Sequence, residues 1–510
     1  MAAEVIADVS CAALNHVQQP PDPAAVHRFL VGSDPGPVKL SQAEATAQLG
    51  DPLATLLFLK GVFPRTGTEL AGALRAAAGD ADPLARIQTF VLAEGSDIVF
   101  SAETASLDRG VRFVVAIGGD KPDVIISVFG PDDAFIEAMG WDRARGGFNF
   151  YRTVHGAWMF AGNSRHALTG PTAGKGPFES HVSGGPLMKE LRFPWVNWNS
   201  PRGGIPASIF APDDPLPRHP WFTGKLNADV FEKITRASIA RWNKVRFAER
   251  AESARVVLRQ VVESQTVNLI CSSTESRLAQ TAQSPVALPQ TFFVDSEALT
   301  EILGLPAPPA ITVSSELYRS TLERFEFRRA APGFERAGDT RFAFVVPERA
   351  FEDTSAVREA TKSGLISERL AACLLMVDFP NPVFSARRAS LLAHASDVPD
   401  AQFSQATADA ILAAAQPSPQ GSPEREFAER WDAGEDWKSA FTPLLEDYYA
   451  TLRPRAETQD GFDDYTRLAQ SRRARLREMP IFENKLLLPE SNLPAQQLEM
   501  RPDGTVREAT

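Results

Sequence analysis

The sequence predicts an α+β fold: an antiparallel β meander near residues 98–161, a long Gly/Pro-rich insert, and a mainly α-helical remainder. Three observations predict it. Short apolar runs between Gly/Asp turns succeed one another up to residue 161, residues 162–224 are dense in Gly and Pro, and helical periodicity dominates after residue 225. Strands and helices do not alternate over most of the chain, which argues against a parallel, doubly wound sheet.

The first 30 residues are rich in Ala and Pro, and they predict an extended N-terminal arm. Helices are expected to follow. Ser41 and Glu44 have the spacing of a capping box, in which each side chain accepts a hydrogen bond from the other residue's backbone N–H. Residues 68–78 are Ala-rich and amphipathic and are followed by Gly79, so we expect a short helix there.

Runs of apolar and β-branched residues predict strands connected by short turns. Residues 135–141 fit either a strand or a helical turn, and both alternatives stay open. His155 falls at one of the predicted hairpin turns. The other expected strands cover residues 111–117, 124–129, 148–151 and 156–160.

After the insert the pattern is mainly helical, with a short β-like stretch at residues 267–272 and a strand at 341–346 that we expect Pro347 to stop. The expected helices cover residues 226–250, 253–263, 296–303, 314–325, 354–362, 366–376, 385–395, 426–452 and 462–479. Residues 416–424 have the composition of a linker. We therefore expect five regions: an arm (1–30), an α+β region (31–161), the insert (162–224), a mainly helical region (225–415), and C-terminal helices with a tail (416–510).

Charge and cysteine usage exclude some classes of protein. The 510 residues carry a formal net charge of −11, whereas a protein that binds duplex nucleic acid needs a basic face. The three cysteines, Cys11, Cys271 and Cys373, are far apart and form no CxxC, which argues against a disulfide framework and a Cys-based zinc site. Heavy use of Ala and of Arg over Lys indicates a GC-rich coding genome, and we expect a bacterial source.

The N-terminal sequence indicates where the protein works. No Lys or Arg occurs in the first 20 residues, where a signal peptide would carry positive charge. The best apolar run, residues 53–63, is interrupted by Lys60 and is far shorter than the ~20 residues of a membrane span. We therefore expect a soluble, cytoplasmic protein with no membrane partner.

Indole and imidazole side chains are concentrated in one fifth of the chain. Residues 141–242 hold six of the eight tryptophans and four of the seven histidines. Much of this stretch is the loop-rich insert, and long structureless segments inside folded chains are usually functional. We therefore expect these rings to line a pocket.

Four side chains of this region form the sharpest candidate site: His155, His166, His181 and Glu179. Imidazole and carboxylate are usual ligands of zinc, iron and copper, so all four are candidate metal ligands. His155, His181 and Glu179 are also candidate catalytic acid or base groups without a metal. The spacings match no metal motif, and ordinary loop histidines that make structural hydrogen bonds are the plain alternative.

Other residues are candidates for substrate contacts. Lys175 lies in a Gly/Pro turn that lacks the Walker spacing and could meet an anion. Aromatic and amide side chains alternate between prolines at Trp195, Asn197 and Trp198. This pattern suits the rigid rim of a ligand pocket. The alternative is that these side chains pack the insert onto the core. Arg387 belongs to a second segment, in which Asp378 ends an apolar helix, Ser385 caps the next helix, and Arg387 and Arg388 occupy its first turn. Because the helix dipole disfavours cations there, we expect a bound anion or a buried acid partner, unless the segment is a plain connection with solvated arginines.

The sequence has no GxSxG, HExxH, GxGxxG after a strand, kinase motif set or CxxCH, although a b-type haem requires none of them. We expect a soluble enzyme, a metal- or haem-dependent oxidoreductase acting on a small molecule with its site in residues 141–222. Two alternatives stay open: a metal-free hydrolase or lyase with a His–carboxylate pair, and a non-catalytic assembly or interaction protein that uses the C-terminal helices. The expected partner is a small-molecule substrate, and the composition is compatible with a homo-oligomer; the cofactor is unknown beyond a transition metal or haem.

Overall fold

The computed structural model confirms the α+β class. It describes residues 20–79, 82–96, 98–107, 109–168, 170–188, 197–200, 204–249, 254–271, 285–307, 309–331, 333–337, 344–396, 398–477 and 490–509. The chain forms two compact units. Unit 1 comprises residues 1–188, 195–245 and 483–486, and unit 2 comprises residues 189–194, 246–482 and 487–510.

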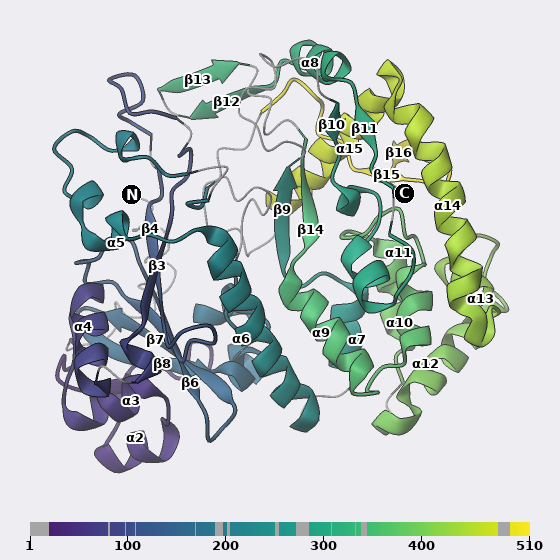
Figure 1. Cartoon of the computed structure of the whole chain (residues 1–510). Coiled ribbons are helices and arrows are strands. Elements are labelled where there is room, and N and C mark those ends of the chain that lie inside the picture. Colours follow the sequence, from purple (N-terminus) through teal and green to yellow (C-terminus); the bar gives the residue numbers. More distant parts are fainter. Residues whose placement is uncertain are drawn as a thin grey trace. The chain divides into compact units, whose positions relative to one another are not determined.

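Unit 1 contains an eight-stranded mixed sheet in the order β2-β1-β8-β7-β6-β5-β4-β3 (Figure 1). Strands β3 to β8 form an antiparallel meander, which the sequence predicted, and only the β1–β8 pair of this sheet is parallel. The open alternative at residues 135–141 is a strand. The strands are β1 (Val26–Arg28), β2 (Val38–Lys39), β3 (Ile87–Leu92), β4 (Arg112–Ile117), β5 (Val124–Val128), β6 (Glu137–Asp142), β7 (Gly147–Val154) and β8 (Ala157–Asn163).

Strand β1 lies within the segment that was expected to be an extended arm. Residues 20–30 of that arm are described, and Val26 to Arg28 pair with Trp158 to Phe160 of β8. The sequence signal missed this strand because three residues are too few to show a period of two. The first 19 residues lie outside the described part of the chain.

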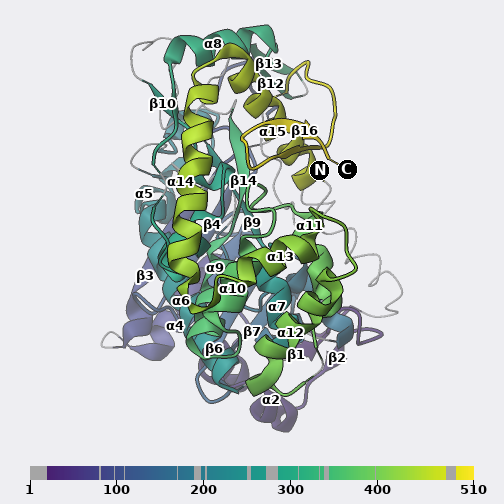
Figure 2. The same cartoon turned by 90° about the vertical axis from the view of Figure 1, so that its right-hand side faces the viewer.

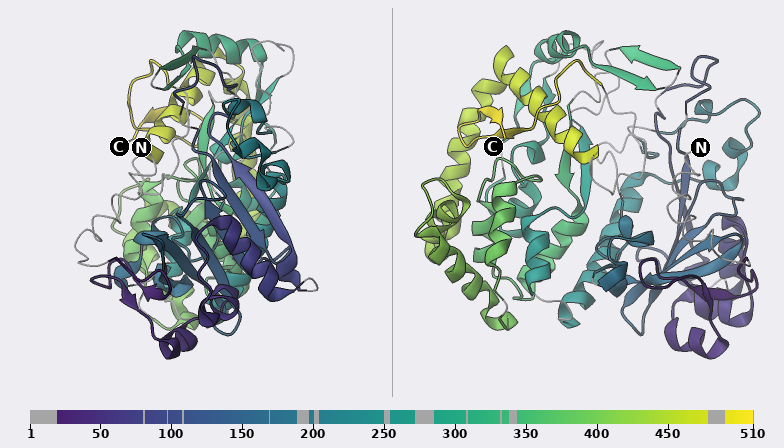
Figure 3. Two further views of the ribbon diagram at one scale, coloured as in Figure 1. Left: turned by 90° about the vertical axis from the view of Figure 1, so that its left-hand side faces the viewer. Right: turned by 180° about the vertical axis from the view of Figure 1, so that it is seen from behind.

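Both faces of the sheet are buried. On one face lie α2 (Gln42–Gln48), α3 (Pro52–Leu56) and α4 (Gly67–Ala78), whose buried leucines share a core with residues of β4 such as Phe113 and Val115 (Figures 1 and 3). On the other face, α6 (Ala228–Glu249) places the Phe231 ring 4.8 Å from the Phe90 ring of β3. Consequently seven of the eight residues of β7 are buried, and each fully buried large apolar side chain contributes about 1.5–3 kcal/mol.

The helices of unit 1 begin at the residues that the sequence indicates. Ser41 and Glu44 form the expected capping box of α2. The Thr66 hydroxyl caps the start of α4, and the helix ends before Gly79. Gly79 has φ of 82°, which glycine adopts without the steric cost that other residues have. The short α5 (Pro220–Thr223) is capped by His219. Short 3₁₀ turns, η1 to η7, cover residues 58–60, 83–85, 164–167, 170–172, 176–179, 207–209 and 216–218.

Asp51 connects the helical layer to the sheet. Its carboxylate caps α3 by accepting hydrogen bonds from the N–H groups of Leu53 and Ala54, and it also accepts from Asn149 Nδ2 at 2.8 Å and from Tyr151 Oη at 2.5 Å. Burial raises the pKa of the Asp51 carboxyl above its usual value, and these hydrogen bonds act in the opposite direction. Asp51 therefore satisfies two buried donors of the sheet as well as a helix end.

Unit 2 is mainly helical. Its α-helices are α7 (Ala254–Val262), α8 (Ser315–Arg324), α9 (Phe351–Lys362), α10 (Glu368–Leu375), α11 (Ala386–Ser390), α12 (Asp400–Ala415), α13 (Pro423–Trp431), α14 (Trp437–Ala456) and α15 (Gln459–Arg477), several of them seen side by side in Figure 2. One-turn segments η8, η9, η11 and η12 cover residues 290–292, 297–302, 391–394 and 434–436. Residues 370–375 of α10 are all buried, which agrees with the apolar run that predicted this helix.

The described residues of unit 2 also form four two-stranded sheets. They pair β9 (Val267–Cys271) with β14 (Val345–Arg349), β10 (Val286–Ala287) with β11 (Thr312–Val313), β12 (Arg328–Ala331) with β13 (Phe334–Ala337), and β15 (Leu498–Met500) with β16 (Val506–Glu508). Pro347 does not stop β14, as we had expected, but lies inside it opposite Leu269. A proline is tolerated here because the sheet has two strands, so β14 is an edge strand that can do without one N–H.

The C-terminal part differs from the prediction in one respect. Residues 426–452 do not form one helix, because α13 ends at Trp431 and α14 begins at Trp437 after a 3₁₀ turn at residues 434–436. In the tail, β15 and β16 form a hairpin. No helix in the described part of the chain has both the length and the apolar character needed to cross a membrane.

We predict that D51A lowers the free energy of unfolding by about 3 kcal/mol, because the substitution removes a helix cap and leaves buried Asn149 and Tyr151 donors unsatisfied. The matched control is D82A, since exposed Asp82 caps residues 83–85 without buried side-chain partners, and we expect it to cost about 1 kcal/mol or less. Urea denaturation followed by tryptophan fluorescence measures both. Equal losses for the two variants would contradict the role given to Asp51.

Candidate functional site

The tryptophans of unit 1 take part in packing on both faces of the sheet. On the face covered by α2 to α4, Trp158 of β8 is fully buried and its indole N–H donates to the Pro64 carbonyl at 2.9 Å. Trp221 of α5 lies on the same side, with its ring centroid 6.3 Å from that of Phe113. These two indoles therefore fill the core between the sheet and its first helical layer.

The other described indoles lie on the face covered by α6. Trp198 stacks on Phe231 of α6 at 5.3 Å, and the Trp242 indole N–H donates to the Ser183 carbonyl at 2.8 Å. Trp141 of β6 packs under the guanidinium of Arg241, 4.2 Å from the ring centroid. The expectation that these rings converge on one pocket is therefore wrong for the described residues; Trp195 lies outside them.

His155 is separated from the other candidate ligands. It occupies the turn between β7 and β8 with φ of 50° and is exposed. His166 lies beyond the other end of β8, in the turn of residues 164–167. Because β8 has seven residues that rise about 3.3 Å each, roughly 20 Å of strand separates the two imidazoles, far more than one metal ion can bridge.

The imidazoles of His166 and His181 are each engaged in a hydrogen bond with the backbone. Nδ1 of His166 accepts from the Asn163 backbone N–H at 3.1 Å and completes a cap, and burial lowers the pKa of this imidazole. Nδ1 of His181 lies 2.8 Å from the Gly185 carbonyl oxygen. Glu179 is exposed, and no three His, Cys, Asp or Glu side chains converge as a metal site among the described residues.

The Phe178 ring packs the turn of residues 176–179 of the insert against the sheet. It packs against Phe150 of β7 with ring centroids 5.2 Å apart. A Cβ atom at Gly162, which has φ of 121°, would lie 2.9 Å from the Phe178 ring, so glycine is required at that position of β8. The insert therefore contributes to the core through an aromatic side chain that the sequence analysis did not single out.

Lys175 and Asn197 also have defined places. The Lys175 side chain crosses Gly32, where an added Cβ would lie 2.6 Å from Lys175 Cδ. Asn197 extends the sheet beside β3, since its carbonyl accepts from the Ala93 N–H at 2.7 Å. The Asn197 side chain is 3% exposed, and neither of its polar atoms has a hydrogen-bond partner among the described residues.

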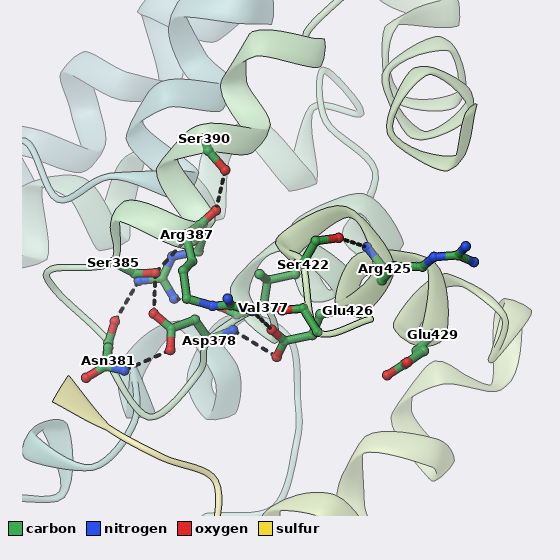
Figure 4. A network of polar contacts seen from close by, with 12 residues as sticks. Val377, Asp378, Asn381, Ser385, Arg387, Ser390, Ser422, Arg425, Glu426 and Glu429 are labelled. Atoms are coloured by element: carbon green, nitrogen blue, oxygen red, sulfur yellow. Dashed lines mark hydrogen bonds and ion pairs between the residues drawn. The ribbon is translucent and has the colours of Figure 1, made fainter. Parts of the chain in front are cut away.

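The second predicted segment is a buried polar network in unit 2 (Figure 4). Ser385 caps α11 as expected, and its hydroxyl donates to Asp378 Oδ2 at 2.6 Å. Arg387 does have the acid partner that we expected, because its guanidinium lies 3.1 Å from Glu426 of α13. Asp378 has φ of 50°, and burial raises the pKa of its carboxyl.

Arg388 is fully buried, and its hydrogen-bond partners differ from the carboxylate partner of Arg387. Its guanidinium donates to backbone carbonyl oxygens of Val262 at 3.1 Å, of Asn381 at 3.0 Å and of Pro382 at 2.7 Å. Burial lowers the pKa of Arg388 to about 10. Two of these carbonyl groups belong to the 378–385 loop and the third ends α7, so the Arg388 side chain holds the loop against α7.

Asn381 connects that loop to the C-terminal hairpin. Its side chain donates to the Met500 carbonyl at 2.9 Å and accepts from the Met500 N–H at 3.0 Å. Arg472 of α15 is also buried and donates to the Pro380 carbonyl at 2.9 Å. These bonds join α10, α15 and β15 through one loop, and they give this region a structural role.

Asp353 is a further buried acid of unit 2. Its carboxylate accepts from the backbone N–H groups of Gln265 at 2.6 Å and of Thr266 at 2.8 Å, which fixes the start of α9 against the segment after α7. Burial raises the pKa of Asp353 to about 6, although the positive charge of Arg349 acts in the opposite direction.

The C-terminal helices were the expected working surface of an assembly protein. Their apolar faces belong to the core of unit 2, where Phe427, Tyr448 and Tyr465 are buried, so this alternative rests on the charged faces of these helices.

A groove in unit 1 combines apolar walls with unpaired charge. Its volume is about 440 Å³, within the range of ligand pockets, and its walls include Val99, Phe100, Phe210, Pro212 and Pro217. The Phe100 N–H donates to the Ser208 carbonyl at 2.8 Å, which holds the two walls together. Val99 is 60% exposed, an unusual state for a large apolar side chain.

Two charged residues border this groove, Asp214 and Arg218. One carboxylate oxygen of Asp214 accepts from the Leu216 N–H at 2.8 Å. The Arg218 guanidinium makes one long hydrogen bond, 3.4 Å, to the Pro212 carbonyl. Within the described part of the chain, neither residue forms an ion pair.

The sequence analysis placed the site in residues 141–222 but did not select the groove residues. Eight of the ten residues that line the groove come from residues 207–218 of the insert, whereas Val99 and Phe100 lie between β3 and β4. The available signal was the set of prolines at positions 206, 212, 215 and 217, which fix the backbone of this wall. Comparisons with family models, with curated proteins and with solved structures gave no match.

We predict that R388A costs about 3–5 kcal/mol of unfolding free energy, because it removes a buried side chain and leaves carbonyl groups unsatisfied. The neighbouring R387A is the control and should cost about 1 kcal/mol, since the Arg387 side chain is 33% exposed and pairs with one carboxylate. Guanidinium denaturation followed by circular dichroism measures both. A smaller loss for R388A than for R387A would contradict the structure.

We predict that the free energy of unfolding of the wild type, measured relative to that of D353N, decreases as pH rises. The folded-state pKa of Asp353 is about 6, above its usual value of 3.8, so the folded state binds the proton more tightly than the unfolded state. The stabilisation is complete below pH 4 and is lost as pH rises through 6, about 3 kcal/mol in total. Urea titrations of both proteins at pH 4, 5, 6 and 7 test this, and a difference that is constant with pH would refute it.

Proposed function

We propose that unit 1 binds a small, largely apolar organic molecule in the groove between Val99–Phe100 and residues 207–218. The single observation that carries the proposal is the groove itself, a concave site with two phenylalanines and two prolines in its walls. Exposed apolar side chains at a concave site gain free energy when a ligand removes them from water. Val99 is such a side chain.

The proposal keeps part of what the sequence led us to expect. A small-molecule ligand and a location largely in the insert are retained. The proposal includes no metal and no haem, because the residues that line the groove include no His, Cys, Met or Tyr and only one carboxylate, Asp214. It assigns binding, and it assigns no reaction to Glu179 or to the histidines.

The wall formed by residues 211–218 is rigid, which supports a groove that exists before the ligand binds. Pro215 and Pro217 fix the backbone around Leu216, and the backbone hydrogen bonds of Asp214 to Ala211 and of Arg218 to Pro215 close two successive turns. A preformed groove does not have to be ordered when the ligand binds, so less of the binding free energy is lost.

We predict that the neutral naphthalene dye prodan binds the wild type with a blue-shifted emission and that V99D weakens this binding at least about five-fold. The substitution places a charge in the apolar wall, whereas the exposed position tolerates it in the fold. V38D is the control, because Val38 is a similarly exposed valine (50%) of β2 that does not line the groove.

A second variant, A207W, should also weaken dye binding, because the added indole would occupy the groove that Ala207 lines. Fluorescence titration of the full-length protein measures all four. If V99D and V38D bind the dye equally and A207W binds it like the wild type, the dye site lies elsewhere and the proposal fails.

A further inference from the structure

The charges at the groove specify more than an apolar ligand. Asp214 and Arg218 are four positions apart and carry opposite charges, yet among the described residues their side chains bond to backbone groups and form no ion pair. Pairs at this spacing meet on an α-helix. Here the chain forms 3₁₀ turns fixed by Pro215 and Pro217, so the usual α-helical spacing is absent and both charges stay available at the groove.

Each charged group has unused capacity for hydrogen bonds. The Asp214 carboxylate has two oxygens, of which one accepts from the Leu216 N–H. The Arg218 guanidinium has five donor hydrogens and uses one in a 3.4 Å bond to a carbonyl. A ligand ammonium would satisfy the first group, and a ligand carboxylate would satisfy the second.

We infer that the groove takes a zwitterion with an apolar body, that is, an α-amino acid with an aromatic or large aliphatic side chain. The ligand ammonium lies at Asp214, its carboxylate at Arg218, and its side chain between Phe100 and Phe210. A simple anion fits less well because Asp214 repels it, and a simple cation fits less well because Arg218 repels it. This inference rests on the proposed groove function and adds the chemical class of the ligand.

The test compares three compounds with the same aromatic body: L-phenylalanine, 3-phenylpropionate, which lacks the ammonium, and 2-phenylethylamine, which lacks the carboxylate. Each competes with prodan for the full-length protein at one ionic strength. We expect L-phenylalanine to displace the dye at a concentration about three-fold lower than either analogue, as partly exposed ion pairs contribute modestly.

Two variants assign the head groups. D214N should weaken L-phenylalanine about three-fold without weakening 3-phenylpropionate, because only the zwitterion uses the carboxylate. R218Q should weaken L-phenylalanine and 3-phenylpropionate about equally without weakening 2-phenylethylamine. The matched control is D213N, which removes the adjacent exposed carboxylate that does not line the groove and should leave all three compounds unchanged.

The outcomes separate this inference from the proposed function. If prodan binding is sensitive to V99D but L-phenylalanine displaces it no better than either analogue, the inference is overturned and the groove function stands. Equal effects of D213N and D214N would also overturn it. If prodan binding is insensitive to V99D and A207W, the proposed function itself fails.

Discussion

Burial of the unit 1 sheet on both faces determines which side chains the rest of that unit must supply for packing. The first face is covered by α2, α3 and α4, and the second is covered by α6 together with Phe178 and Trp198 of the insert. An eight-stranded sheet with two buried faces needs large side chains on both sides, and the insert supplies Phe178 and Trp198 to the second face. Within the described part of the chain, the density of aromatic residues in this region therefore reflects packing, and the indoles described there pack against the sheet or its covering helices.

The same constraint explains where a ligand site is left. Residues 207–218 lie beyond the part of the insert that packs on the sheet through Phe178, and prolines hold them as turns. Their apolar side chains meet Val99 and Phe100 without closing over them, so a groove with exposed Val99 remains. In the polar segment of unit 2, by contrast, the Arg388 and Arg472 side chains are buried and their guanidiniums are hydrogen-bonded to backbone carbonyls.

Local patterns in the sequence predicted most of the elements. The strands of the meander, the capping box at Ser41 and Glu44, and the cap at Ser385 follow from neighbouring residues, whose chemistry acts over a few positions. The β1 strand was missed because its partner in β8 lies about 130 residues away in the chain, and no local signal records such a pairing. Pro347 was misjudged because tolerance of proline depends on strand position within the sheet.

The site could be predicted less well than the fold. Counting His and Trp located the loop-rich insert, but the count does not say which face of the sheet each ring packs on. The strand length of β8 separates His155 from His166, and this is a property of the folded chain. Asp214 and Arg218 become a candidate pair only when the turns between them are known, since the same spacing on a helix would pair them with each other.

The most direct test of the groove as the ligand site is photo-crosslinking with a diazirine analogue of leucine, an apolar zwitterion, followed by peptide mapping by mass spectrometry. We expect labelled residues in the peptides that contain Val99–Phe100 and residues 207–218, with labelling suppressed by excess L-phenylalanine. Suppressible labelling confined to residues 155–181, around His155, His166 and His181, would contradict the groove and return the site to the histidines.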